Sequence, residues 1–80
     1  MAKVIVYSQP TCGPCNAEKA WFDAEGIAYE DRNVHASQDW LRELVALGSQ
    51  STPTTVVESE DGRDVVIGFD RNRLRALLGR

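Results

Sequence analysis

The sequence predicts an α/β fold in which four strands form one mixed sheet with helices on both of its faces. Runs of β-branched and apolar residues alternate with stretches of helical periodicity, in the order βαβαββα. The first strand, helix and strand have the length of a right-handed crossover, which joins parallel strands. The dipeptide Asp61-Gly62 between the last two strands is typical of a hairpin turn, so that pair is expected to be antiparallel.

The first half of the chain is expected to supply a strand, a helix and a second strand. Residues 3–7 form a β-branched run that is typical of a central strand buried on both faces. Residues 16–25 predict a helix that stops at Gly26. Residues 27–34 alternate loosely between apolar and polar side chains and predict the second strand. The apolar positions of the helix are Ala17, Ala20, Trp21 and Ala24, with Phe22 beside them, and we expect Trp21 and Phe22 in the core.

The second half predicts two more helices and a hairpin. Ser37 is expected to cap a helix that ends at Gly48, and residues 54–58 and 64–67 predict the two strands of the hairpin. Asp70 is expected to cap the last helix, and Gly79 to end it. The apolar face of the middle helix is expected to carry Trp40, Leu41, Leu44, Val45 and Leu47, and that of the last helix Leu74, Leu77 and Leu78.

Length and charge narrow the classes of function. Eighty residues predict a single domain, 1–80, with a modest core. A net charge of −3 argues against nucleic acid and against an acidic membrane surface as partners. No apolar run approaches the roughly 18–20 residues of a membrane span, and the first three residues lead into a strand without a signal-peptide region. We therefore expect a cytoplasmic protein, and in that compartment a lone cysteine pair favours catalysis over structure.

Both cysteines of the chain lie in the segment Thr11-Cys12-Gly13-Pro14-Cys15, between the first strand and the first helix. Residues three apart at the start of a helix share one face, so a disulfide can form between them and break without large backbone movement. A structural disulfide is one alternative, although so short a loop removes little chain entropy. A zinc site is another, but it normally needs four ligands, and His35 is the one further histidine or cysteine in the sequence. Cytoplasmic Cys-x-x-Cys near a βαβ pattern is typical of redox chemistry.

The two cysteines are expected to play different catalytic roles. Cys12 precedes the helix, where unpaired N–H groups and the helix dipole favour an anion, so we expect a lowered thiol pKa and the attacking thiolate there. Cys15 lies one turn further on and is suited to resolve the mixed disulfide. Pro14 falls at about the first helical position, where its missing N–H costs nothing. Gly13 lets the backbone of a partner approach closely.

Three segments together resemble the glutaredoxin family of thioredoxin-fold proteins, over essentially the whole chain. They are residues 7–15 around the cysteines, Ser51-Thr52-Pro53-Thr54, and Gly68-Phe69-Asp70. The resemblance implies the minimal glutaredoxin core of the thioredoxin-like fold and a cis peptide bond between Thr52 and Pro53, beside the active-site cysteines. The dipeptide Gly13-Pro14 is similar to that of thioredoxin, and the Gly68-Phe69 segment is similar to NrdH-type redoxins, which take electrons from thioredoxin reductase.

The resemblance implies a thiol–disulfide oxidoreductase that acts on protein or mixed disulfides through Cys12 and Cys15. It also implies substrate contacts at Thr11, Gly13, Pro14, Thr52, Pro53, Gly68, Phe69 and Asp70. Phe69 has two interpretations, a core residue or part of an apolar patch that docks a partner. Lys19 could favour the Cys12 thiolate, whereas Glu18 and Asp70 would oppose it at close range. We expect a monomer without a metal ion or a tightly bound cofactor.

The electron donor is either glutathione, as a co-substrate, or thioredoxin reductase. Glutathione carboxylates would lie at the N–H groups near Phe69 and Asp70, and its cysteine would pair with the backbone of Thr52. A different class of function is a dimer that holds an iron–sulfur cluster through Cys12 and glutathione, as some glutaredoxins do. A third is an inert adaptor of the same fold, which the presence of both cysteines disfavours.

Overall fold

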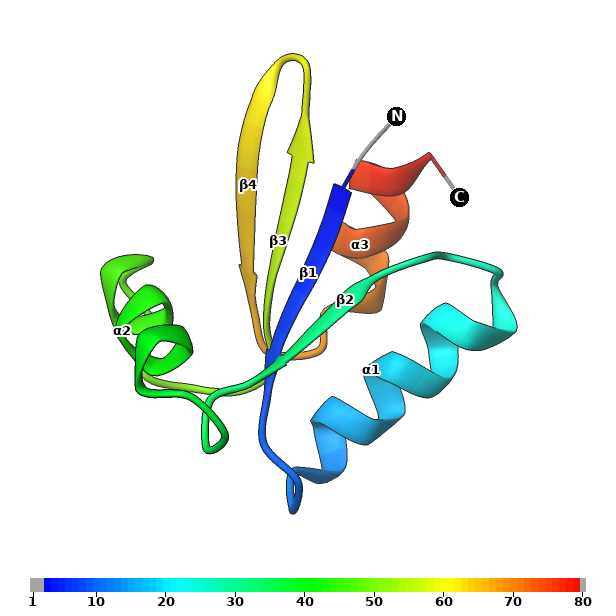
Figure 1. The fold of residues 1–80 in the computed structure, drawn as a ribbon. Helices are drawn as coiled ribbons and strands as arrows, with labels where there is room; N and C mark the ends of the chain where they lie inside the picture. The colour runs from blue at the N-terminus through cyan, green and yellow to red at the C-terminus, as the bar shows by residue number, and fades with distance from the viewer. Residues whose placement is uncertain (1–2, 80) are drawn as a thin grey trace.

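The computed structural model describes residues 3–79 and places seven elements along them (Figure 1). Their order is the predicted βαβαββα. They are β1 (Lys3–Ser8), α1 (Gly13–Ala24), β2 (Glu30–Asn33), α2 (Gln38–Ala46), β3 (Thr54–Ser59), β4 (Gly62–Ile67) and α3 (Arg71–Leu78).

The four strands form the predicted mixed sheet, in the order β2-β1-β3-β4. Strand β1 pairs in parallel with β2 and antiparallel with β3, and β3 pairs antiparallel with β4. Residues 4–8 of β1 are all buried, because β1 has a strand on each side and helices over both faces. The sheet carries the site on its central strands, since the cysteine loop follows β1 and Pro53 directly precedes β3.

Alternating side chains of the sheet build two apolar layers. On one face, α1 and α3 cover a cluster that includes Val6, Phe22 and Leu74. On the other face, α2 covers a cluster that includes Tyr7, Leu44 and Val56. Figure 1 shows this division, with α2 on one side of the strands and α1 and α3 on the other. The prediction of helices on both faces is therefore confirmed.

The second strand is shorter than predicted. The periodicity suggested residues 27–34, but β2 comprises only Glu30–Asn33. Ile27 and Val34 are buried, at 8% and 4% exposure, although both lie outside the strand. The backbone N–H of Ile27 donates to the carbonyl of Phe22 at 2.9 Å, so the chain first folds back onto α1 before it pairs with β1. Burial thus extends beyond the paired residues.

The buried face of α1 differs from the predicted one. Ala17, Ala20 and Ala24 are exposed, Trp21 is half-buried, and Phe22 is fully buried as predicted. Alanine contributes little apolar area, so the large Phe22 determines which face turns inward. The residues that share this inward face are Cys15, Glu18 and Phe22.

The apolar face predicted for α2 is likewise too wide. Leu44 is buried and Trp40 and Leu47 pack against the same cluster, but Leu41 and Val45 are 44% and 57% exposed. A nine-residue helix that rests on a sheet contacts it along a narrow stripe, and Leu41 and Val45 lie outside that stripe. The caps at Ser37 and Asp70 are as predicted, since their side chains accept hydrogen bonds from the N–H groups of Trp40 and Arg73.

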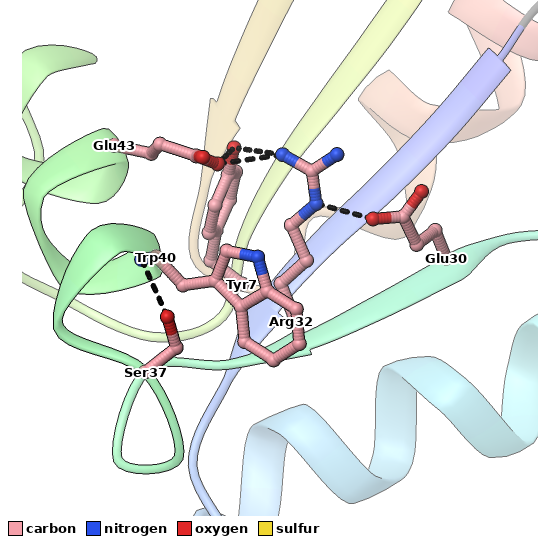
Figure 2. Close-up of polar contacts among 6 residues, drawn as sticks. All are labelled: Tyr7, Glu30, Arg32, Ser37, Trp40 and Glu43. Atoms are coloured by element: carbon pink, nitrogen blue, oxygen red, sulfur yellow. Dashed lines mark hydrogen bonds and ion pairs between the residues drawn. The ribbon is translucent and has the colours of Figure 1, made fainter.

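A polar cluster joins α2 to the sheet (Figure 2). Glu43 of α2 accepts hydrogen bonds from the Tyr7 hydroxyl at 2.8 Å and from Arg32 Nη1 at 2.6 Å. Arg32 also pairs with Glu30, and this hydrogen bond holds the pKa of Glu30 below its ordinary value. Burial, followed by the hydrogen bond to Glu43, raises the pKa of Tyr7. The cluster fixes α2 over β1 and β2.

Candidate active site

The two cysteines form a disulfide at the start of α1. Their Cα atoms are 5.2 Å apart, within the range that a disulfide spans without strain on the backbone. Cys12 is half-buried and Cys15 is fully buried. A partner can therefore approach Cys12, whereas Cys15 is covered by protein. This asymmetry matches the two roles that the sequence predicts.

Cys12 is the N-cap of α1, and its sulfur is held by the helix backbone. The N–H of Cys15 donates to Cys12 Sγ at 3.1 Å, and Pro14 occupies the first turn. The structure thus extends the helix three residues beyond the predicted start, because Pro14 already has helical geometry. An N–H donor and the positive end of the helix dipole both face the sulfur of Cys12, and these groups stabilise a negative charge.

The turn before β3 brings Thr52 and Pro53 to the cysteines. The Thr52–Pro53 peptide bond is cis, as the resemblance implies, and Pro53 is fully buried. The carbonyl oxygen of Thr52 lies 3.6 Å from Cys12 Sγ. A partner backbone that extends past Cys12 therefore meets polar backbone groups of Thr52.

Hydroxyl groups of the preceding loop hold this turn, and the sequence alone does not single them out. The Thr54 hydroxyl donates to the carbonyl of Ser51 at 2.7 Å and lies 2.7 Å from the hydroxyl of Ser49. Ser49 is 2% exposed and Thr54 is fully buried. The sequence feature that could have pointed to these hydrogen bonds is the cluster of serine and threonine residues around Pro53.

The turn before α3 is tied to the same site. The N–H of Gly68 donates to the carbonyl of Pro53 at 2.8 Å, and Gly68 has a φ of +83°, which favours glycine. Phe69 is half-buried and packs against the core, with its ring 6.2 Å from that of Trp21, which agrees with the core interpretation. Asp70 caps α3. Thr52, Pro53 and Gly68 thus come together, and the other predicted contacts, Thr11, Gly13 and Pro14, lie exposed around Cys12.

Two of the charged residues near the cysteines are engaged with other partners. Lys19 pairs with Asp31 of β2 at 3.0 Å, so much of its charge is compensated there. Asp70 is occupied with the N–H of Arg73. No metal-binding group of three or more His, Cys, Asp or Glu side chains occurs within residues 3–79.

Glu18 is the unexpected residue of the site. It is fully buried, and its Oε2 accepts a hydrogen bond from the Thr55 hydroxyl on β3. Among the described residues Oε1 has no hydrogen-bond partner. Burial raises the pKa of Glu18 from an ordinary 4.5 to about 7, although the bond from Thr55 acts in the opposite direction. The sequence feature that could have singled out Glu18 is its position three residues after Cys15, on the same face of the helix.

A groove of about 340 Å³ lies elsewhere, on the α2 face of the sheet. Its floor includes Ile5, Tyr7 and Val56, and charged residues such as Lys3 and Arg63 surround it. Neither cysteine lines this groove. The candidate site is therefore centred on the half-buried Cys12 rather than on this groove.

A buried cysteine behind a half-buried one at a helix N-terminus, next to a cis-proline turn on a four-stranded mixed sheet, defines a redoxin of the thioredoxin-like fold. The glutaredoxin family model matches residues 4–61, and the chain belongs to the glutaredoxin family. No helix within residues 3–79 is long and apolar enough to cross a membrane.

Similar proteins include both redoxins and a regulator. A glutaredoxin-like protein NrdH of Lactococcus lactis is 26% identical over 58 residues, which cover 72% of this chain and 78% of that protein. The global transcriptional regulator Spx of Listeria innocua is 28% identical over 67 residues, which cover 80% of this chain but only 43% of Spx. Among solved structures, the thioredoxin-like protein BC3987 has a TM-score of 0.82 and 37% identity, covering 94% of this chain and 99% of its own.

Proposed function

We propose that this protein reduces protein or mixed disulfides by dithiol exchange, with Cys12 as the attacking thiolate and Cys15 as the resolving thiol. The observation that carries the proposal is the asymmetry of the pair, since Cys12 is accessible at a helix N-terminus and Cys15 is fully buried behind it. The Cys12 thiolate attacks a partner disulfide and releases one partner thiolate. Cys15 then attacks Cys12 Sγ, releases the second partner thiolate and leaves the Cys12–Cys15 disulfide.

The substrate is proposed to lie in an extended conformation against the turn at Thr52. This carbonyl lies beside Cys12 Sγ, so the backbone of a substrate cysteine joined to Cys12 is positioned to pair with it. Thr11, Gly13 and Pro14 would border the same path, because all three are exposed around the sulfur. This mode of binding recognises backbone rather than sequence, which suits a monomer that acts on several cytoplasmic proteins.

Two electron donors are candidates for reducing the Cys12–Cys15 disulfide. Glutathione is the donor of the glutaredoxin family, and its carboxylates would lie near Phe69 and Asp70 at the start of α3. The relative named NrdH and the dipeptide Gly13-Pro14 support thioredoxin reductase as the second candidate. Either donor would deliver electrons to the same disulfide. The exchange itself requires no metal and no tightly bound cofactor in this protein.

Steady-state turnover with both donors tests the proposal. NADPH consumption is followed with a disulfide substrate, once with glutathione and glutathione reductase and once with thioredoxin reductase alone. We expect turnover in at least one system, and its complete loss in Cys12→Ser. Ser59→Ala, an exposed change of one hydroxyl remote from the cysteines, serves as the matched control.

The pattern of turnover identifies the donor. Turnover with glutathione alone makes this protein a glutathione-dependent glutaredoxin, and turnover with thioredoxin reductase alone makes it an NrdH-like electron donor. Absence of turnover in both systems, with a folded protein, contradicts the proposed activity. Visible absorbance of an iron–sulfur cluster after anaerobic reconstitution, together with that absence, would support the cluster-binding alternative instead.

A further inference from the structure

The groove on the α2 face of the sheet has no part in the proposed exchange reaction. Its volume of about 340 Å³ falls within the range of small-molecule sites, and neither cysteine lines it. Helix α2 has nine residues and lies beside one end of the strands, so it leaves the other end of this sheet face open (Figure 1). The side chains around the open part therefore decide what the groove can bind.

The floor of the groove is apolar, and its backbone groups are already paired. Ile5, Tyr7 and Val56 are buried side chains of β1 and β3 that lie on this face. Both strands are central, with a hydrogen-bonded neighbour on each side. A peptide laid over the floor could not add a strand, so its own N–H and C=O groups would lose water without gaining a partner. A hydrocarbon body, which has no such groups, suits this floor better.

The end of the groove beside α2 offers apolar surface but no surplus of positive charge. Ala46 and Leu47 border the groove from the helix. Arg32 and Glu43 lie next to them and pair with each other, and Arg32 also pairs with Glu30 (Figure 2). The one cation at this end is thus shared between two carboxylates, so this end suits the uncharged part of a ligand.

The opposite end of the groove carries a surplus of one positive charge. Lys3, Glu58 and Arg63 stand in one row across β1, β3 and β4, because Glu58 is the register partner of both cations. Register partners of antiparallel strands share a face, and all three residues line the groove. Neither Lys3 nor Arg63 forms an ion pair within residues 3–79. Both cations are therefore available to an anion that enters the groove.

We infer that this groove binds a small amphipathic monocarboxylate, with its carboxylate at Lys3 and Arg63 and its hydrocarbon body along the floor towards α2. One negative charge balances the surplus at the open end. A second negative charge on the ligand would meet Glu58 without a further cation to offset it, which excludes phosphate esters and other dianions. The floor spans about 13 Å from Lys3 to Tyr7 at roughly 3.3 Å per strand residue, which leaves room for a medium-length hydrocarbon chain.

Decanoate is the probe, and the amide chemical shifts of nitrogen-15-labelled protein show where it binds. We expect saturable shifts at residues of the groove such as Ile5, Leu47 and Val56, and none at Cys12 or Cys15. Decanol has the same chain without the charge and should bind more weakly. The Cys12→Ser variant should bind decanoate as the native protein does, because binding requires no disulfide exchange. Failure of the proposed function would therefore leave this binding unchanged.

Substitutions at exposed positions separate the apolar contacts from the charged ones. Ala46→Glu places a carboxylate on the α2 border of the groove and should weaken decanoate binding by at least about tenfold, because like charges then meet. Gln38→Glu adds the same charge to α2 outside the groove and is the matched control. The double variant Lys3→Ala/Arg63→Ala should weaken decanoate binding about fourfold or more, since an exposed ion pair contributes about twofold to fivefold. Decanol binding should not change in the double variant.

Absence of saturable binding below the micellar concentration of decanoate contradicts the inference. Equal affinities of the native protein and Ala46→Glu contradict it too, as do equal affinities of decanoate and decanol. Shifts of the same groove residues that depend on protein concentration alone would assign the groove to a second copy of the chain and overturn the proposal. The four substituted residues are exposed, so the variants should fold, and native-like amide spectra check this for each of them.

Discussion

Replacing Glu18 by glutamine is expected to change the pH dependence of stability in a direction opposite to that of most carboxyl groups. The folded protein binds a proton at Glu18 more tightly than the unfolded chain does, since its pKa is raised from 4.5 to about 7. The stabilisation from this proton is fully present below about pH 4.5 and is lost as the pH rises through about 7. The side-chain amide of the Glu18→Gln variant does not titrate, so the variant lacks this loss.

The size of the effect follows from the two pKa values. A pKa of about 7 against 4.5 corresponds to about 3 kcal/mol at roughly 1.4 kcal/mol per pH unit. The group is fully buried, so solvent does not screen this energy. About 3 kcal/mol is a large share of the roughly 5–15 kcal/mol that stabilises a small domain. Any fixed cost of burying the amide is independent of pH and cancels when two pH values are compared.

Urea unfolding of the oxidised protein measures this difference. The free energy of unfolding is determined between about pH 4.5 and 8 for the native protein, for Glu18→Gln and for Asp23→Asn. The difference between Glu18→Gln and native protein should grow in favour of the variant by about 3 kcal/mol over this range, whereas Asp23→Asn should follow the native curve closely. Parallel curves for Glu18→Gln and native protein would refute the assignment of a raised pKa to Glu18.

Two further predictions test the packing around the site by the same unfolding measurement. Ser49→Ala removes a buried hydroxyl that binds Thr54 in the turn before β3, and should cost about 1 kcal/mol, whereas Ser59→Ala should change stability by less than about 0.5 kcal/mol. Leu74→Ala empties a fully buried position between α3 and the sheet and should cost about 2–5 kcal/mol. Leu41→Ala, at 44% exposure on α2, should cost less than about 1 kcal/mol. Equal losses within either pair would contradict the burial described for it.

The order of the elements and the redox pair could be predicted because both depend on local signals. The β-branched residues of β1 and the Asp61-Gly62 turn identify central strand and hairpin within a few positions of sequence. The three-residue spacing of Cys12 and Cys15 is by itself sufficient to predict a redox-active pair. The cis bond before Pro53 could not be predicted from local residues alone, because proline at that place also allows the trans form. Only the family resemblance favoured the cis form.

The inward faces of the helices could not be predicted, because they depend on what the sheet presents to them. The alanines of α1 form a plausible apolar face, but Phe22 turns the helix so that Glu18 lies inside. A charged residue is the last type that a hydrophobic pattern places in a core. Its partner, Thr55, is 37 positions away and reads in the sequence as an ordinary strand residue.

The energetic cost of burying Glu18 and the raised basicity of its carboxylate have the same origin. Desolvation makes the carboxylate unfavourable by about 3 kcal/mol, and it thereby makes the group a stronger base than an exposed glutamate. This base lies on the same inward helix face as the buried Cys15, one helical turn away. Below about pH 7 the carboxyl group of Glu18 is mostly neutral, and this neutral form is the one that burial favours.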